Sequence, residues 1–321
     1  MRKSLIKEDV LREISKGKVV SGGLIASKLG VSRTAVWKTV NSLRAEGFFI
    51  SGENGGYMLS PYNTRICGAQ AEFAVETKNL VFKEVSASTN EDAKALAETG
   101  AEEFTTVFAK KQTGGKGRLS RSFFSPEGGL YFSVVLRPAL SAESTVKITT
   151  AAAVSMAKAI EKVAQLRPKI KWVNDIYISG KKVCGILTEG AFDAENGHLK
   201  YAVLGVGVNV AMPKDGFPEE ISDKAGALYS SSTPPALVYY ALINEFLREF
   251  KNYYADIENM PHIAEYRVRS FLDGKTVSYH KDGKSHTAKV IGIGDNAELI
   301  VEENGKKTLL SSGEVSLTDY E

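Results

Sequence analysis

Apolar residues recur at helical spacing near the start of the chain. Val36, Val40 and Leu43 stand at i, i+4 and i+7, which predicts a helix with one buried stripe. A shorter apolar face in residues 24–29 predicts another helix just before it, and Ser32 is a good N-cap for the second helix. The stretch FFISGENGGYML then alternates around Asn-Gly-Gly, which is a hairpin signal. This order of elements is typical of a winged helix-turn-helix.

The second predicted helix carries cationic, hydrogen-bonding and aromatic side chains opposite its apolar stripe. Such a face suits the major groove of DNA, where side chains read base edges and cations hold phosphates. Residues 1–60 hold ten Lys or Arg against five Asp or Glu, although the whole chain has a net charge of only +3. We therefore predict a DNA-binding domain in residues 1–62; the alternative is a small helical docking module with a solvated charged face. The candidate DNA-contacting residues are Ser32, Arg33, Thr34, Trp37, Lys38 and Asn41.

Strand-like runs and helical repeats interleave through the middle of the chain. The stretch IYISGKKVCGIL predicts a hairpin on a Ser-Gly turn, and Ser88 three residues before Glu91 has the form of a helix-opening capping box. Because hairpins recur among the interleaved elements, the predicted fold class is α+β rather than a doubly wound parallel sheet. This domain is placed at residues 65–270, after a break at residues 61–64. Strands are predicted at 80–85, 104–110, 128–138 and 201–210, and long helices at 141–164 and 235–255.

The sequence pattern changes again from about residue 272. Short strands separated by Asp-Gly, Gly-Asp-Asn and Asn-Gly turns predict a small SH3-like β-barrel over residues 272–321. No run of eighteen apolar residues occurs and the basic start has no hydrophobic segment, so we expect a cytoplasmic protein without a membrane span. Cys67 and Cys184 have neither metal-ligand spacing nor a disulfide framework, so two reduced thiols are expected.

The segment KQTGGKGRLSRS, residues 111–122, contains two lysines, two arginines and three glycines but no acidic residue. Glycines let backbone N–H groups approach an anion, and Lys116, Arg118 and Arg121 can neutralise phosphate oxygens. The segment lacks the glycine spacing of a Walker A motif and the third glycine of a dinucleotide fingerprint. Its own chemistry leaves open either a phosphate-ester site or a mobile solvated loop.

Five short motifs follow one another along the body of the chain. They are Ser88-Thr89-Asn90, Gln112-Thr113-x-Gly115-Lys116-Gly117-Arg118, Lys171-Trp172-x-Asn174-Asp175, Lys182-Val183-x-Gly185-Ile186-Leu187 and Gly205-x-Gly207-x-Asn209. Together they resemble the biotin–protein ligase family, and with the basic winged helix in front they are similar to its bifunctional ligase/repressor members. The resemblance covers essentially the whole chain. A lipoate–protein ligase shares the enzyme architecture, but the winged helix and the fourth motif favour biotin.

The resemblance implies an ATP-dependent, AMP-forming biotin–protein ligase. Biotin carboxylate attacks the α-phosphate of ATP, giving biotinyl-5′-AMP and pyrophosphate, and a lysine of a biotin carboxyl carrier protein then attacks the mixed anhydride. It also implies Mg²⁺, and biotinyl-5′-AMP as both intermediate and corepressor. Residues 111–123 and 211–230 would order around this adenylate and complete the surface of a homodimer that binds a palindromic operator. Edge strands such as 199–208 are candidates for that dimer surface.

The resemblance further assigns roles to individual residues. Arg118 and Lys182 are the expected catalytic cations, because negative charge spreads over phosphoryl oxygens in the transition state. Asp175 is the expected Mg²⁺ ligand, and Phe217 is the expected stacking lid of the adenylate-binding loop. The expected biotin-binding residues are Ser88, Thr89, Asn90, Gln112, Gly115, Lys116, Arg118, Lys182 and Gly185. The expected nucleotide-binding residues are Arg118, Arg121, Asn174, Lys182, Asn209 and Phe217.

The chain departs from the family pattern at a few positions. Val173 stands where proline is frequent, which alters turn rigidity rather than chemistry. Residues 111–123 are called the basic loop from here on. In this loop Lys116 replaces an arginine, which keeps the charge but loses bidentate geometry, and Ser120 replaces a glycine, which reduces flexibility. Two further alternatives remain: a ligand-sensing repressor with an inactive enzyme body, and a ligase whose N-terminal domain no longer binds DNA.

Overall fold

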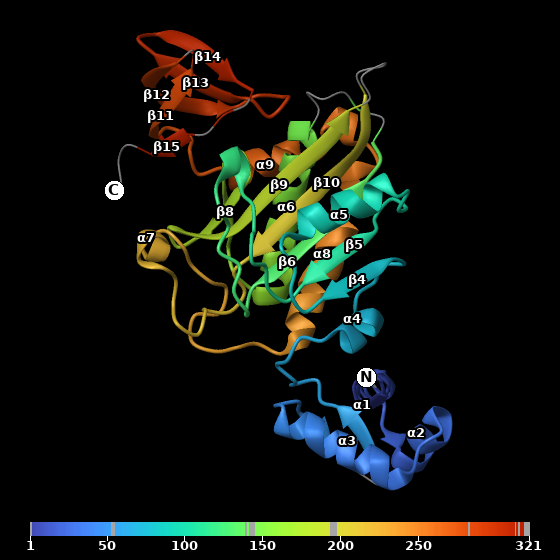
Figure 1. Cartoon of the computed structure of the whole chain (residues 1–321). Coiled ribbons are helices and arrows are strands. Elements are labelled where there is room, and N and C mark those ends of the chain that lie inside the picture. Colours follow the sequence, from blue (N-terminus) through green and yellow to red (C-terminus); the bar gives the residue numbers. More distant parts are fainter. Residues whose placement is uncertain are drawn as a thin grey trace.

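Three structural units follow one another along the chain. The computed structural model describes residues 2–52, 55–138, 140, 145–192, 198–281, 283–311, 313 and 315–317. Figure 1 shows a helical N-terminal domain and a C-terminal sheet at opposite ends of a central α/β body. Within the described residues, no helix is long and apolar enough to cross a bilayer.

The N-terminal domain contains three helices and a small sheet. Ser32 caps the third helix as predicted, since its Oγ accepts a hydrogen bond of 3.1 Å from the Ala35 N–H. The stripe Val36, Val40 and Leu43 is buried, also as predicted. The hairpin forms too, although Asn54 of its predicted turn lies outside the described residues. The elements are α1 (Arg2–Ile14), β1 (Val20–Ser21), α2 (Gly22–Leu29), α3 (Arg33–Ala45), β2 (Ile50–Ser51) and β3 (Gly56–Leu59).

The break predicted at residues 61–64 is packed against the body. Asn63 is fully buried, and its carbonyl accepts a hydrogen bond of 2.7 Å from the Ala236 N–H at the start of α8 (Ala236–Tyr254). Cys67 joins the apolar core of the N-terminal domain, while its backbone bonds to the Tyr240 hydroxyl of α8. The N-terminal domain is therefore docked on the body rather than tethered by a free linker.

A mixed seven-stranded sheet forms the body, in the order β4-β5-β6-β10-β9-β8-β7. Among the strand pairs of this sheet in the described part of the chain, β4–β5 is parallel and the others are antiparallel. This mixture bears out the predicted α+β class. The strands are β4 (Leu80–Lys83), β5 (Thr106–Ala109), β6 (Leu130–Leu136), β7 (Lys169–Lys171), β8 (Asp175–Ile178), β9 (Lys181–Phe192) and β10 (Leu199–Val208).

The prediction that residues 199–208 form an edge strand is wrong. This segment is β10, which pairs with β6 on one side and β9 on the other, near the middle of the sheet. The physical reason lies in its composition: an apolar run whose side chains are buried on both faces, such as Val203 and Leu204, belongs inside a sheet. The sheet ends instead at β4 and β7.

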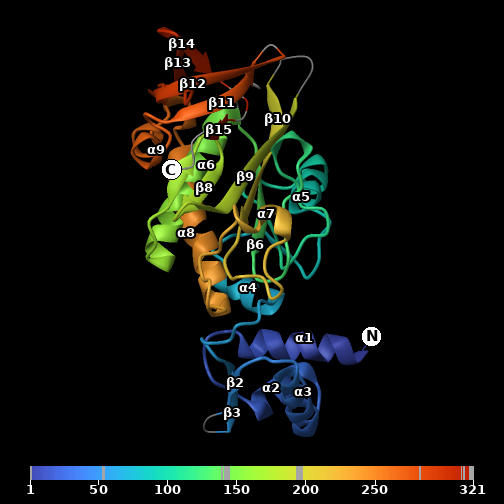
Figure 2. The same ribbon diagram turned by 90° about the vertical axis from the view of Figure 1, so that its left-hand side faces the viewer.

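Helices cover both faces of this sheet, as Figure 2 shows. The long helices α6 (Thr145–Ala164) and α8 pack together against one face, while α5 (Thr89–Glu98) covers the other. Residues 141–144 of the helix predicted at 141–164 lie outside the described residues. The shorter helical segments are α4 (Gly68–Ala74), η1 (Arg118–Ser120), α7 (Glu219–Ser222), η3 (Ile257–Asn259) and α9 (Ile263–Arg269).

The predicted capping box at the start of α5 is not made. Ser88 occupies the N-cap position, but its side chain makes no capping hydrogen bond. Instead Gln112 Oε1 accepts a hydrogen bond of 2.8 Å from the Thr89 N–H, one of the donors that a helix start leaves unpaired. Glu91 forms ion pairs with Lys94 and Lys116. The first N–H of the helix is therefore bonded to Gln112 of the basic loop rather than to a capping side chain of the helix itself.

The C-terminal unit is a five-stranded antiparallel sheet in the order β14-β13-β12-β11-β15. Its closure into an SH3-like barrel stays a prediction. The indole of Trp172 joins it to the body, because Nε1 donates a hydrogen bond of 2.8 Å to the Ala297 carbonyl. Its strands are β11 (Thr276–Lys281), β12 (Lys284–Ile293), β13 (Leu299–Glu303), β14 (Lys306–Leu310) and β15 (Val315–Leu317).

Candidate active site

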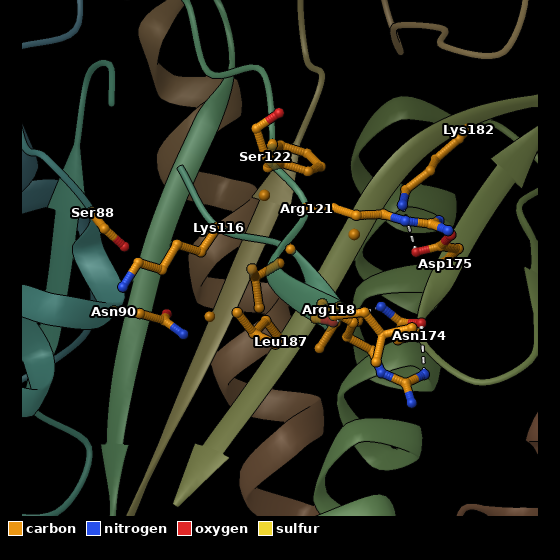
Figure 3. A pocket seen from close by; sticks show the side chains of 18 of the residues that line it. Ser88, Asn90, Lys116, Arg118, Arg121, Ser122, Asn174, Asp175, Lys182 and Leu187 are labelled. Atoms are coloured by element: carbon orange, nitrogen blue, oxygen red, sulfur yellow. Dashed lines mark hydrogen bonds and ion pairs between the residues drawn. The ribbon is translucent and has the colours of Figure 1, made fainter. Parts of the chain in front are cut away.

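One pocket beside the central sheet is lined by residues from all five motifs. Figure 3 shows Ser88, Asn90 and Lys116 on one side of it and Asn174, Asp175 and Lys182 on the other. Segments far apart in the chain therefore meet here, as the order of the motifs led us to expect. Of the predicted ligand-binding residues, the pocket is lined by Ser88, Thr89, Asn90, Gln112, Lys116, Arg118, Arg121, Asn174, Asp175, Lys182 and Gly185.

Glycines in β9 and β10 make room for larger side chains in the pocket. A Cβ atom on Gly205 would lie 2.1 Å from Asn90 Oδ1, and one on Gly207 would lie 2.6 Å from the Phe123 ring. Gly185 also faces that ring, which would lie 3.1 Å from an added Cβ. Because real Cβ atoms essentially never approach within 3.0 Å, a side chain at position 205 or 207 would displace Asn90 or Phe123, whereas one at position 185 would crowd the ring less. Phe123 was missed as a site residue, although it stands at the aromatic position of the family's loop pattern.

Gln112 connects the start of α5 to the end of the basic loop. Besides the Thr89 N–H, its Oε1 accepts from the Thr89 hydroxyl at 3.1 Å, and its Nε2 donates to Ser125 Oγ at 3.0 Å. The Ser125 hydroxyl in turn donates to the Phe123 carbonyl at 2.8 Å. Ser125, which was not predicted, thus holds the backbone of the loop next to the pocket.

The basic side chains of the pocket have specific partners. Lys182 Nζ lies 2.6 Å from Asp175 Oδ1, and Arg118 Nη1 donates to Asn174 Oδ1 at 3.3 Å. Asn174 is itself fixed, since its Nδ2 donates to the Ile186 carbonyl at 2.8 Å. Figure 3 shows the side chain of Arg121 extending toward Lys182 and Asp175. The pocket therefore has a strongly cationic end suited to phosphate oxygens.

The basic loop folds back on itself beside the pocket. The Gly117 N–H bonds to the Arg121 carbonyl and the Phe123 N–H to the Gly115 carbonyl, each at 2.8 Å. At the tip, Leu119 and Ser120 adopt left-handed φ values of 55° and 59°. A left-handed backbone costs a non-glycine residue roughly 1 to 2 kcal/mol. Glycine at position 120, as in the family pattern, would avoid this strain.

Asp175 is the candidate Mg²⁺ ligand, and the groups around it can be compared with the ligands that Mg²⁺ usually takes. Its Oδ1 is buried and accepts no well-aligned hydrogen bond, although Lys182 neutralises it. Among the described residues there is no cluster of three or more His, Cys, Asp or Glu side chains. Mg²⁺ commonly takes only one or two carboxylates and completes its shell with substrate phosphates and water. A single Asp175 fits that arrangement, but not a metal held by protein alone.

Three of the predicted residues are not among those that line the pocket. Asn209 is buried, and its Nδ2 donates to the Gly226 carbonyl at 2.9 Å, which fixes the loop 211–230 to β10. The half-buried Phe217 of that loop packs edge-on against Phe124, with ring centroids 6.4 Å apart. Gly115 is a close-approach position, because an added Cβ would lie 2.5 Å from Ser125 Oγ. The predicted binding roles of these three residues stay predictions.

A second hollow lies on the N-terminal domain. Arg33, Thr34 and Trp37 of α3 line it together with glycines of α2 and Tyr57 of β3. Trp37 is 54% exposed, which is unusual for a tryptophan. Lys38 is exposed and Asn41 half-buried on the same helix, whereas Ser32 mainly serves as the N-cap. The predicted DNA-facing side chains therefore do lie at the surface.

Comparison with known proteins decides the family. Residues 82–209 match the biotin/lipoate A/B protein ligase family, and residues 7–58 match the HTH domain family. The bifunctional ligase/repressor BirA of Bacillus spizizenii is 33% identical over 97% of this chain and 98% of its own length. The corresponding BirA of Bacillus subtilis is 32% identical over 98% of this chain and 99% of its own length. The chain belongs to the BirA family of bifunctional ligase/repressors.

Solved structures agree with this membership. The biotin protein ligase from Aquifex aeolicus in complex with biotin and ATP superposes with a TM-score of 0.63 at 27% identity. The match covers 75% of this chain and 99% of that chain. Within the BirA family, the described pocket with its five motifs is the candidate ligase site, and α3 is the candidate DNA-reading helix.

Proposed function

We propose that this protein is an ATP-dependent biotin–protein ligase that is also a biotin-responsive transcriptional repressor. The observation that carries the proposal is the convergence of all five motifs on one pocket, in a chain that aligns with bifunctional ligase/repressors over nearly its whole length. The ligase reaction takes place in the body and operator binding in the N-terminal domain. Both the carrier protein and the operator are cytoplasmic partners, so we place the protein in the cytoplasm.

In the first step, an oxygen of the biotin carboxylate attacks the α-phosphorus of ATP. The bond from that phosphorus to the bridging oxygen breaks, and pyrophosphate leaves. Biotin lies against the side of the pocket formed by Ser88, Asn90 and Gln112, and the phosphates lie at the cationic end. Arg118 and Lys182 stabilise the negative charge that grows on the phosphoryl oxygens, without having to reorganise during the reaction.

In the second step, the amine of a carrier lysine attacks the acyl carbon of biotinyl-5′-AMP. The acyl carbon–oxygen bond breaks, AMP leaves with that oxygen, and the amine loses a proton to give an amide. The basic loop shields the mixed anhydride from water until the amine arrives. Mg²⁺ would be held by Asp175 together with the nucleotide phosphates, where it would neutralise phosphate charge.

The repressor activity couples the same pocket to DNA. Biotinyl-5′-AMP is the proposed corepressor, and a liganded homodimer presents two copies of α3 to a palindromic operator. The edge-on contact between Phe124 and Phe217 supports this coupling, because Phe124 directly follows the basic loop and Phe217 lies in the loop 211–230. Closure of the basic loop on the adenylate would therefore also shift the loop 211–230 through this contact.

Two experiments test the proposal. The protein is incubated with biotin, Mg-ATP and a carrier domain, and the carrier is weighed by mass spectrometry alongside a reaction with lipoate. Pyrophosphate release and a carrier mass increased by one biotin are expected; transfer of lipoate instead, or no release at all, would refute the ligase assignment. A gel shift with a palindromic site at stated salt, with and without biotin and ATP, tests repression. Sedimentation of the same samples tests the dimer.

A further inference from the structure

A carboxylate outside the five motifs holds Asn90 in place. Glu189 of β9 accepts a hydrogen bond of 2.7 Å from Asn90 Nδ2 through Oε2. Its Oε1 accepts another from Lys94 Nζ, also at 2.7 Å. Asn90 and Lys94 are four residues apart, so they share one face of α5. Asn90 is only 4% exposed and lines the pocket, so Glu189 contacts the pocket wall from behind.

This contact fixes the orientation of the Asn90 side-chain amide. A side-chain amide has a donor end and an acceptor end, whereas a carboxylate only accepts. The donor end of Asn90 must therefore face Glu189. The acceptor end, Oδ1, faces the fully buried Ser133, whose hydroxyl donates to it at 2.6 Å.

The same polarity continues to the next pocket residue. Ser133 Oγ also lies 2.8 Å from Thr89 Oγ1, while the single proton of the Thr89 hydroxyl is directed to Gln112 Oε1. With its acceptor end turned to Ser133, the Asn90 amide has its second N–H left for a ligand. The direction of this donor is therefore set at Glu189.

The outer part of the network contributes less. Glu91 Oε1 accepts from Lys94 at 2.9 Å and from Lys116 of the basic loop at 2.8 Å, which extends the network to the loop. The Lys116 and Glu91 side chains are 52% and 45% exposed, and ion pairs this exposed are worth about 1 kcal/mol or less. The inner contact to the buried Asn90 is the one with consequences for binding.

We propose that Glu189 is a positioning residue for biotin: it fixes the orientation of the Asn90 amide and with it the donor and acceptor pattern offered to the ureido group. This inference rests on the proposed ligase function. A ureido group has one carbonyl acceptor flanked by two N–H donors, so it binds only to a wall of complementary order. Glu189 acts through Asn90, far from the carboxylate end of biotin, and should affect binding rather than the chemical step.

The test uses the Glu189→Gln variant of the full-length protein. Glutamine has the same shape, but it can donate to Asn90 Oδ1 and so permits the amide to turn over. The KM for biotin in pyrophosphate release should rise about tenfold, the equivalent of one hydrogen bond, while kcat stays within about twofold. Glu98→Gln is the matched control, because Glu98 ties α5 to β10 through Lys200 and Tyr201 without reaching the pocket. It should leave the KM unchanged.

A double-mutant cycle shows whether Glu189 acts through Asn90. In an Asn90→Ala background, Glu189→Gln should have no further effect on the KM for biotin. An equal rise in both backgrounds, or an unchanged KM in Glu189→Gln alone, would overturn the inference while leaving the ligase assignment intact. A wild-type protein that neither releases pyrophosphate nor binds biotin in calorimetry would refute the proposed function and this inference together. Urea unfolding of each variant separates altered binding from lost stability.

Discussion

Lys182 and Asp175 form an ion pair between the neighbouring strands β9 and β8, with Lys182 Nζ 2.6 Å from Asp175 Oδ1. The pair lies at the end of the pocket opposite Asn90 (Figure 3). It brings the expected catalytic cation and the expected Mg²⁺ ligand into direct contact, so each holds the other where phosphates are expected to bind. The Lys182 ammonium is only partly exposed, so it stabilises the negative charge of a phosphoryl transition state better than a fully solvated cation would.

Replacing Lys182 should therefore slow adenylate formation. Lys182→Gln removes a cation from the developing phosphoryl charge and leaves Asp175 without its partner. Pyrophosphate release should fall by roughly 100- to 1000-fold, with a much smaller change in the KM for biotin. Lys181→Gln is the control, since the exposed Lys181 contacts only the Ser222 carbonyl at 3.3 Å among the interactions described. Loss of activity in both variants would point to misfolding instead.

Replacing Arg118 should make the enzyme release its intermediate. Arg118 connects the basic loop to Asn174 on the far side of the pocket, and Arg118→Gly removes both this link and a cation near the phosphate. The adenylate should escape more readily, so labelling of bystander lysines should rise relative to the carrier lysine. Labelling is measured with biotin, Mg-ATP, a carrier domain and an unrelated protein in one tube. Strictly carrier-specific labelling by the variant would contradict the shielding role of the loop.

The residues that meet at the candidate site were predictable from sequence because each motif is local and ordered along the chain. Single polar residues in strands were not. Ser133 interrupts the apolar run LYFSVVL, a signal that could have been used, but Glu189 has no motif of its own. The partners of a strand were not predictable either. The apolar run in residues 199–208 indicates a strand inside a sheet, a signal that the edge prediction did not use, but it does not say that β6 and β9 are its neighbours.

The pH dependence of stability should report on His262. This side chain is fully buried, its Nε2 lies 2.9 Å from Thr150 Oγ1, and burial lowers its pKa from 6.5 to about 4. Because the pKa of His262 is lower in the folded protein, this side chain binds its proton at a higher pH in the unfolded chain than in the folded one. The stability associated with the neutral ring is complete above pH 6.5 and is lost as the pH falls toward 4, by on the order of 3 kcal/mol.

Urea unfolding between pH 7 and pH 4.5 measures this effect. His262→Gln should be less stable than wild type at pH 7, but its free energy of unfolding should fall less steeply over the acid range. His280→Gln, at an exposed position, should keep the wild-type slope. Carboxylates also titrate near pH 4.5, so the effect of His262 is read from the difference in slope between the variants and the wild type. Parallel slopes for all three proteins would show that His262 does not cause the acid sensitivity.

The strained tip of the basic loop gives a last prediction, at Ser120. Its φ of 59° is left-handed, so Ser120→Gly relieves strain in the folded protein. Glycine also increases the entropy of the unfolded chain, which offsets part of that gain. The free energy of unfolding should therefore stay equal or rise by up to about 1 kcal/mol. Ser122→Gly, where φ is not positive and the backbone pairs with Lys116, should lose about 0.5 to 1 kcal/mol. Equal losses in the two variants would show that the tip is unstrained in solution, because only a left-handed position favours glycine.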